Sequence, residues 1–207
     1  MTVMQIVQQL FGSMGITMEI FFVTLITSLI LGLGLALIRM SKNPILSVIA
    51  KFYISVMRGT PLMLQLLVVY FGPFFIFGMQ ITPSYRLKAV LIGFALNYAA
   101  YFAEIYRGGI ESMPIGQYEA AEILGYTKVQ TFVKIIFPQV MKRILPSITN
   151  EVITLVKDTS IAYVLSVQEM FTVAKAISAS QASVSPLIIA QYFTMCLTYR
   201  GICDGAH

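Results

Sequence analysis

The sequence predicts an all-α membrane protein that crosses the bilayer about five times and forms one domain over residues 1–207. The first observation is composition: 57% of the residues are hydrophobic and only 11% are charged, against about 25% charged in soluble domains. A domain of this length keeps much of its surface exposed, so that surface must partly face lipid. The second observation is that the apolar residues gather in long runs with one long polar connection between them. Cytosolic enzymes, secreted disulfide scaffolds and disordered chains are therefore excluded.

Five apolar runs are candidate crossings, because about 20 residues span the roughly 30 Å of hydrocarbon. They are residues 16–38, 61–79, 89–103, 148–167 and 187–199. The fourth is the least hydrophobic, since it contains Glu151, Lys157 and Asp158. The fifth is short, and as a helix it extends only about 20 Å. We therefore expect the last transmembrane helix to be truncated near 197–207.

The distribution of Lys and Arg predicts the orientation of the crossings. The first 38 residues contain neither, whereas the first connection and the long third connection are rich in both. The positive-inside rule then places these two connections in the cytoplasm, the N-terminus outside and the C-terminus inside. The net charge of +5 is therefore attributed mostly to basic residues on the cytoplasmic side of the membrane, and not to a surface that binds nucleic acid.

The third connection, residues 106–147, is too long to be a simple turn between crossings. Gly108 and Gly109 predict a bend, and Pro114 with Gly116 predicts a second break. Residues 117–124 are good helix formers, and Gly125 follows them where a helix-capping glycine belongs.

A capping box, Thr127 with Gln130, opens the next helix. We expect that helix to stop near Pro138, and Pro146 to break the chain again. The loop would thus hold a short helix between glycines, lying across the crossings. From physics alone, a solvated amphipathic helix is an equally good interpretation.

The spacing of this loop resembles a known motif. Glu119-Ala120-Ala121, three residues, Gly125, nine residues and Ile135-Ile136-Phe137-Pro138 resemble the EAA loop of ABC importer permeases, with Phe137 in place of the usual Leu. The resemblance implies the type I ABC importer permease fold, in which this short helix docks on an ATPase. It assigns the ATPase-coupling role to Gly116, Glu119, Ala120, Ala121 and Gly125.

Other segments resemble the polar amino acid importer family, the histidine, glutamine and arginine type permeases. They are Met57-Arg58-Gly59-Thr60-Pro61-Leu62, Ala103-Glu104-Ile105 with Arg107-Gly108-Gly109, and Val156-Lys157-Asp158-Thr159-Ser160. The resemblance implies a multi-pass permease subunit in a prokaryotic cell membrane, which forms half of a translocation pathway. It further implies a second permease copy or homologue, ABC ATPase subunits that use ATP and Mg, and an extracytoplasmic amino-acid-binding protein. The chain has no P-loop of its own.

Polar groups within the predicted crossings are candidates for the substrate pathway, because ionisable residues there usually face a bundle interior or an aqueous cavity. Glu151 and Asp158 are seven residues apart and therefore share one helix face. Together with Thr159 and Asn97, they could hold the ammonium group of an amino acid. The alternative is that these groups form polar contacts that hold crossings together.

Three other functions are alternatives to this one. An ATP-independent secondary transporter or channel subunit would show inverted repeats, which the sequence lacks. An intramembrane enzyme would need a metal or nucleophile constellation. With one His, His207, and two separated cysteines, Cys196 and Cys203, the sequence predicts no metal site, catalytic residue or bound cofactor. A purely structural subunit is less consistent with intramembrane carboxylates.

Overall fold

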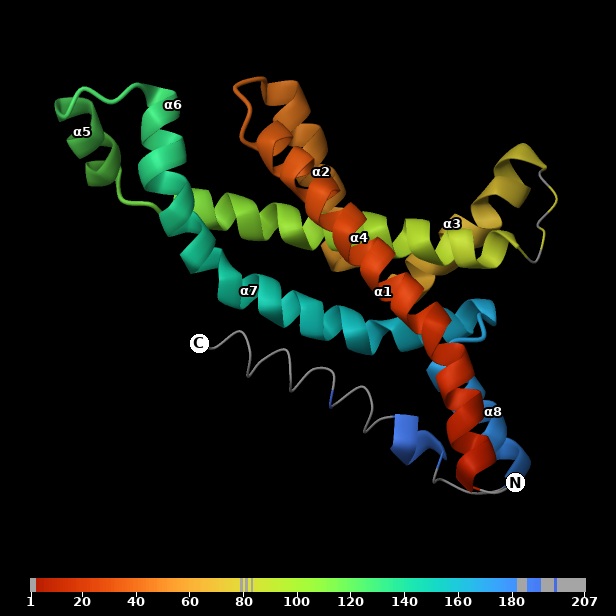
Figure 1. Cartoon of the computed structure of the whole chain (residues 1–207). Coiled ribbons are helices and arrows are strands. Elements are labelled where there is room, and N and C mark those ends of the chain that lie inside the picture. The colour runs from red at the N-terminus through yellow and green to blue at the C-terminus, as the bar shows by residue number, and fades with distance from the viewer. Residues whose placement is uncertain are drawn as a thin grey trace.

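The computed structural model describes residues 3–78, 80, 82, 84–181, 186–190 and 196, and within them the chain is almost entirely helical. Figure 1 shows long helices that cross one another, with shorter helices projecting at the ends. In chain order the elements are α1 (Val3–Arg39), α2 (Pro44–Gly59), α3 (Leu62–Phe77), α4 (Tyr85–Glu111), α5 (Ile115–Ile123), α6 (Lys128–Gln130), the π-helix η1 (Thr131–Ile136), α7 (Phe137–Asp158), the 3₁₀-helix η2 (Thr159–Leu165) and α8 (Met170–Gln181).

The core lies where α1 crosses α4, with α3, α7 and η2 packed around the crossing (Figure 1). Ile20, Phe94 and Phe102 are fully buried there. A Cβ on Gly32 of α1 would lie 2.7 Å from the Cβ of Phe102, so the two helices can approach this closely only with glycine at that position. The arrangement explains why α4 is the most buried of the long helices, although its ends carry charged residues.

Two described helices are long and apolar enough to cross a membrane, Met4–Arg39 and Tyr85–Glu111. A third span results if α2 and α3, which meet at an angle of 112°, are counted as one broken crossing. The count of about five crossings therefore stays a prediction. Most of the run 187–199, and with it the expected truncation near 197–207, lies outside the described residues.

The break between α2 and α3 is held by side-chain amides. The Nε2 of Gln65 donates to the backbone oxygen of Met57 at 2.9 Å and to the Oγ1 of Thr60 at 2.7 Å. Asn97 of α4, which is 4% exposed, donates from Nδ2 to the Oε1 of Gln65 at 2.8 Å and to the same Met57 oxygen at 3.2 Å. These bonds satisfy backbone oxygens that the broken helix leaves unpaired.

The bend predicted at Gly108 and Gly109 is wrong, because α4 continues through both glycines to Glu111. The role of Gly109 is close packing. A Cβ there would lie 2.2 Å from the Cγ2 of Ile144 and 3.2 Å from the Cγ1 of Val140, both on α7. The glycine therefore permits α4 and α7 to touch, and the chain leaves the helix three residues later, at Ser112.

The helix breaks predicted at Pro138 and Pro146 are also wrong. The chain is helical without interruption from Lys128 to Leu165, and both prolines lie inside that length. Pro138 follows η1, where the Phe137 N–H bonds to the Phe132 oxygen, five residues back. This wider turn falls where the rod bends between α6 and α7 in Figure 1, as expected when a π-turn interrupts the regular ladder.

The fourth apolar run, 148–167, is not one α-helix. The α-helical part ends at Asp158, and the chain continues as the tighter η2 to Leu165. Ser166 then adopts a left-handed conformation with φ of 55° and turns the chain toward α8. The change of helix type occurs within the segment that holds the candidate pathway residues.

Candidate translocation pathway and coupling segment

The short helix predicted for residues 117–124 is confirmed as α5, which begins two residues earlier than expected, at Ile115. Pro114 precedes α5 in an extended conformation with φ of −61° and ψ of 137°. The chain therefore changes direction between the end of α4 and the start of α5. Figure 1 shows α5 and α6 projecting together beyond the ends of α4 and α7. We call residues 115–127 the coupling segment.

Gly125 ends α5 with the geometry that its sequence position predicts. Its φ is +78°, a left-handed conformation that costs side-chain-bearing residues about 1–2 kcal/mol. The Gly125 N–H bonds to the Glu122 oxygen at 2.9 Å, and the Tyr126 N–H bonds to the Ala121 oxygen at 3.0 Å. This pair of bonds is a Schellman motif, so the coupling segment has a defined end rather than a frayed one.

The predicted capping box follows directly. The Oγ1 of Thr127 accepts from the Gln130 N–H at 3.3 Å, and the Oε1 of Gln130 accepts from the Thr127 N–H at 3.0 Å. Near the other end of α5, the Nε2 of Gln139 on α7 donates to the Oε1 of Gln117 at 3.2 Å. The coupling segment is therefore tied at both ends to neighbouring helices and can move with them as one body.

The two alanines of the coupling segment face opposite environments. Ala121 is fully buried where α5 packs on η1, whereas Ala120 and Glu119 are exposed. Around them large apolar side chains are also exposed, including Ile115 at 74% and Ile123 at 87%. The exposed apolar patch consists of Ile115, Ile123, Leu124 and Val129. Glu122 lies beside it, on a groove of about 330 Å³ between α5 and the start of the next helix.

The carboxylates predicted for the pathway lie beside α4. The hydroxyl of Tyr98 donates to the Oδ2 of Asp158 at 2.7 Å, which joins α4 to the end of α7. Glu151 lies two turns earlier on the same face of α7 and is partly buried. Tyr98 stacks on Phe94 with a centroid distance of 6.3 Å. The structure thus brings Glu151 and Asp158 to one face, with Tyr98 opposite them.

Of the other two predicted pathway residues, Thr159 lines a cavity beside the end of α7, whereas Asn97 lies elsewhere. Thr159 is 2% exposed and donates from Oγ1 to the Val156 oxygen at 2.8 Å. Asn97, adjacent in sequence to Tyr98, points to a different face of α4 and holds the break between α2 and α3. Their side-chain donors are therefore already committed within the chain.

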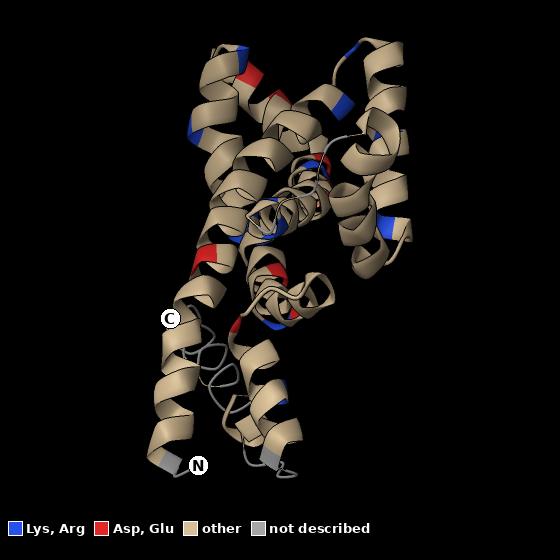
Figure 2. Ribbon diagram, turned by 90° about the vertical axis from the view of Figure 1, so that its right-hand side faces the viewer, with Lys and Arg blue, Asp and Glu red and all other residues tan. Residues whose placement is uncertain are grey.

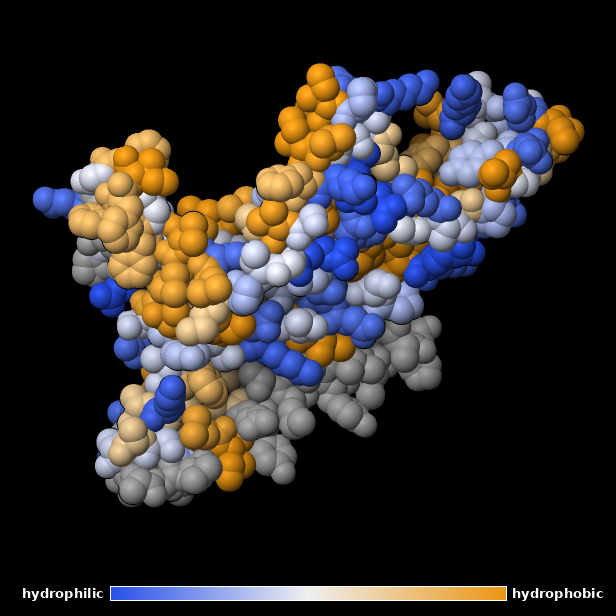
Figure 3. Space-filling model, turned by 180° about the vertical axis from the view of Figure 1, so that it is seen from behind, coloured by the Kyte–Doolittle hydropathy of each residue, from blue (hydrophilic) through white to orange (hydrophobic). Residues whose placement is uncertain are grey.

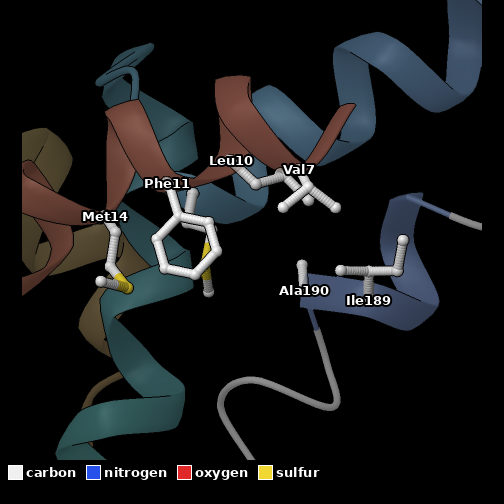
Figure 4. Close-up of a pocket in the computed structure, with 7 residues that line it drawn as sticks. Val7, Leu10, Phe11, Met14, Ile189 and Ala190 are labelled. Atoms are coloured by element: carbon white, nitrogen blue, oxygen red, sulfur yellow. The ribbon is translucent and has the colours of Figure 1, made fainter. Parts of the chain in front are cut away.

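A polar cavity of about 200 Å³ lies next to these groups. Its lining includes the exposed Lys157 and the half-buried Ser160, together with Thr17 of α1 and Glu169. Lys157 forms no ion pair with any residue that the structure describes. By contrast, the pocket drawn in Figure 4, between α1 and residues 186–190, is lined by apolar side chains such as Phe11 and Ile189 and offers nothing to a polar ligand.

Glu169 is a site residue that the sequence analysis missed. It is 1% exposed, and its carboxylate caps α8 by accepting from the N–H groups of Phe171 at 2.7 Å and Thr172 at 2.6 Å. Burial raises the pKa of the Glu169 carboxyl, and these hydrogen bonds oppose the shift. An acidic residue immediately before a helix was the available signal, but its contact with the cavity depends on the fold of α1 and η2.

A second polar cluster, also unpredicted, surrounds Glu104 of α4. Its Oε1 lies 2.8 Å from the Nη1 of Arg39, and its Oε2 accepts from the Nη2 of Arg107 at 2.7 Å. Arg58 is 3.9 Å from the same oxygen and lies over the ring of Tyr101, 5.3 Å from its centroid. Figure 2 shows that the charged residues concentrate in the half of the molecule away from the N-terminus.

These features define a helical membrane subunit with a tethered, projecting helix and polar side chains held between its helices. Residues 28–199 match the family described as the binding-protein-dependent transport system inner membrane component, and the chain belongs to that family. The fold class predicted from the sequence is thereby confirmed. Members of this family are non-enzymatic membrane subunits of ABC transporters, and the ATPase is a separate subunit.

Related proteins agree with this assignment. The chain is 39% identical over 192 residues to the probable amino-acid ABC transporter permease protein YckA of Bacillus subtilis, covering 93% of this chain and 81% of the relative. It is 41% identical over 178 residues to the arginine transport system permease protein ArtQ of the same organism, covering 86% and 80%.

Solved structures show the same architecture. The crystal structure of an amino acid ABC transporter with histidines superposes with a TM-score of 0.88 at 32% identity, covering 100% of this chain and 97% of that one. An inward-facing MetNI methionine ABC transporter superposes with a TM-score of 0.80 at 17% identity, covering 100% and 96%, which supports the fold alone. The secondary-transporter alternative is not favoured by any of these relatives.

Proposed function

We propose that the chain is the permease subunit of an ATP-driven importer of polar amino acids and that it forms half of the translocation pathway. Several relatives are named as amino-acid permeases, including an arginine permease and glutamine permeases. The observation that carries the proposal is the opposition of charges at the end of α7. Glu151 and Asp158 lie on one side, and Lys157, which has no ion-pair partner among the described residues, lines the adjacent cavity.

This arrangement suits a zwitterion. An α-ammonium group needs carboxylate oxygens, which Glu151 and Asp158 supply, and an α-carboxylate needs a cation and donors, which Lys157 and Ser160 supply. Asn97 acts as a positioning residue through the break between α2 and α3. Thr159 shapes the turn from α7 into η2, so it sets where Asp158 points.

The coupling segment is the docking site for the partner ATPase in this proposal. Exposed Glu119, Ala120 and Gly116 surround a small surface that a cleft can enclose, and the apolar patch supplies area to bury. Because α5 is tied to α7 through the Gln117–Gln139 bond and packs on η1, a push on α5 is passed to the continuous helical rod that leads to Asp158. ATP and Mg are used by the ATPase, since this chain has no phosphate-binding loop.

The complete importer contains two ATPase subunits, an extracytoplasmic amino-acid-binding protein and a second permease, either a copy of this chain or a homologue. It lies in the cell membrane of a prokaryote, with the N-terminus outside and the C-terminus in the cytoplasm. The concentration of basic residues away from the N-terminus supports this orientation. The partners are these proteins and membrane lipid, with no role for nucleic acid.

Uptake into liposomes tests the proposal. The permease is reconstituted with the ATPase and with the binding protein, and labelled polar amino acids are supplied outside. We expect accumulation only when both partners and ATP are present. Uptake by the permease alone would show a secondary transporter or channel, and ATP-dependent uptake of some other solute class would reject the amino-acid assignment.

A further inference from the structure

Arg58, near the end of α2, lies between two carboxylates. Its Nη1 is 3.9 Å from the Oε2 of Glu104 on α4, and its positive charge also acts on the Glu151 carboxylate of α7. The guanidinium lies over the ring of Tyr101, 5.3 Å from the ring centroid. Arg58 therefore belongs to the same polar region as the predicted pathway residues, although it comes from a different helix.

The register of α4 against α7 places Glu151 at the level of this arginine. The two helices run in opposite directions (Figure 1) and touch at two points, where Gly109 lies against Ile144 and where Tyr98 bonds to Asp158. Glu151 is seven residues from both contact positions on α7, so all three share one face of that helix. Glu151 therefore faces α4 midway between the two contacts.

The matching part of α4 carries the two residues that Arg58 contacts, Tyr101 and Glu104. The ring of Tyr101 also lies 6.1 Å from the ring of Tyr98, whose hydroxyl bonds to Asp158. A series of side-chain contacts thus leads from Arg58 to the end of α7. Figure 3 shows that hydrophilic side chains gather across the middle of one face of the molecule, with apolar side chains beside them.

Glu104 has closer partners than Arg58. Its Oε1 lies 2.8 Å from the Nη1 of Arg39, and its Oε2 lies 2.7 Å from the Nη2 of Arg107. Arg107 also pairs with Glu111, so these four residues contribute two cations and two carboxylates. The charge of Arg58 is therefore available to another carboxylate.

The groups that remain at the end of α7 carry one charge of each sign. Asp158 is the anion, and Lys157, which has no ion-pair partner among the described residues, is the cation. The Glu169 carboxylate at the same cavity is committed to the N–H groups at the start of α8. With Glu151 balanced by Arg58, the region complements a zwitterion whose side chain is uncharged.

We propose that Arg58 is a specificity-determining residue, which balances the charge of Glu151 and makes the permease prefer neutral polar amino acids, such as glutamine, over cationic ones, such as arginine. This inference rests on the proposed function, and it assigns the α-ammonium group to Asp158 and the α-carboxylate to Lys157. A cationic substrate side chain must displace Arg58 from Glu151, whereas a neutral amide side chain leaves that pair in place. The cost of the displacement is the basis of the selection.

Binding of labelled glutamine and labelled arginine to the purified permease–ATPase complex in detergent tests this inference, because it measures the permease without selection by the binding protein. We expect the natural chain to bind glutamine more tightly than arginine. Arg58→Gln should raise the binding of arginine relative to glutamine about tenfold, because Glu151 becomes free for a substrate cation. Arg58→Lys keeps the charge and should keep the natural preference.

Two controls isolate the effect of the pair. Arg86→Gln, the same substitution near the start of α4, should leave both affinities unchanged. In a Glu151→Gln chain the additional Arg58→Gln change should not alter the ratio, because the contested carboxylate is absent. The comparison is repeated as ATP-dependent uptake into liposomes with one binding protein throughout, so that the preference of the binding protein cancels between variants.

The outcomes separate this inference from the proposed function. An equal loss of both amino acids in Arg58→Gln would show that Arg58 only holds the fold, and an unchanged preference would show that Glu151 does not discriminate. Either result overturns the inference alone, as would tighter binding of arginine than of glutamine by the natural chain. Absence of both binding and ATP-dependent uptake of either amino acid by the natural importer would instead reject the proposed function, and the inference with it.

Discussion

The hydroxyl of Tyr98 donates a 2.7 Å hydrogen bond to the Oδ2 of Asp158, and this bond joins the centre of α4 to the last residue of α7. Tyr98 is 2% exposed, so the carboxylate is held at the edge of the buried core. Asp158 is also the residue at which α7 gives way to the tighter η2. The side chain proposed to contact the substrate therefore lies where α7, η2 and α4 meet.

We predict that Asp158→Asn lowers ATP-dependent amino acid uptake at least about tenfold, because the amide keeps the Tyr98 bond but removes the charge for an ammonium group. Initial uptake rates in proteoliposomes measure the effect. Glu19→Gln, an equivalent change on α1, serves as the control and should transport normally. Full uptake by Asp158→Asn would show that the carboxylate only packs.

Tyr98→Phe removes the hydroxyl that donates to Asp158. We predict a loss of about 1–3 kcal/mol in the free energy of unfolding, because the partly buried carboxylate loses a partner. Tyr101→Phe is the matched control, because Tyr101 lies about one helical turn further along α4 and does not bond to Asp158. Thermal unfolding in detergent measures both variants. Equal stability of the two would mean that water replaces Tyr98 at no cost.

The coupling segment supplies the third prediction. Gly125→Val forces a β-branched residue into a φ of +78°, which displaces the end of α5. We expect the assembled transporter to hydrolyse ATP without uptake, and Glu119→Lys to give the same uncoupling. Gly125→Asn, which tolerates the left-handed region, should retain most of the coupling.

Two controls accompany this measurement. Gly12→Ala in α1, where an added Cβ meets nothing within 4 Å, should leave uptake and hydrolysis coupled. Recovery of the intact complex must be equal for all variants. Normal uptake by an assembled Gly125→Val transporter would contradict the docking role.

The contact between α4 and α7 gives a fourth prediction with a neighbouring control. Gly109→Ala places a Cβ 2.2 Å from the Cγ2 of Ile144, so we expect a loss of about 1–3 kcal/mol in unfolding free energy. Gly108→Ala, where nothing lies within 4 Å, should be neutral or slightly stabilising. Chemical unfolding of both in the same detergent decides the matter, and indistinguishable curves would show that the helices separate easily.

The Glu104 cluster provides the fifth prediction. Glu104→Gln leaves Arg39 and Arg107 facing each other without a shared carboxylate, and we expect it to cost about 2 kcal/mol of stability. Glu111→Gln removes a partner of Arg107 that is 53% exposed, so the cost should stay below about 1 kcal/mol. Thermal unfolding compares the two, and an equal cost would show that solvent screens the whole cluster.

Local rules predicted the features whose causes are local. The presence of α5, the cap at Gly125 and the capping box of Thr127 depend on residues within a few positions of one another, and each was found as expected, although α5 begins two residues earlier than predicted. The apolar runs likewise predicted the long helices, because length and composition are enough to identify them.

Tertiary packing explains what local rules missed. Gly109 resembles a bend in sequence, but its role is set by Ile144, 35 residues later. Pro138 resembles a stop, but the π-turn before it carries the helix onward. Tyr98 and Glu169 gave no spacing signal that connected them to the pathway, since their contacts join elements far apart in the chain. The pathway roles of Glu151 and Asp158 remain predictions.

The break between α2 and α3 has a consequence for biosynthesis. A backbone oxygen without a partner is costly inside the hydrocarbon, and the oxygen of Met57 receives bonds from both Gln65 and Asn97. Gln65 emerges from the ribosome soon after Met57, but Asn97 follows only when the next helix has been made. The break between α2 and α3 can therefore be fully satisfied only after α4 has been synthesised, and we expect these helices to leave the insertion machinery together.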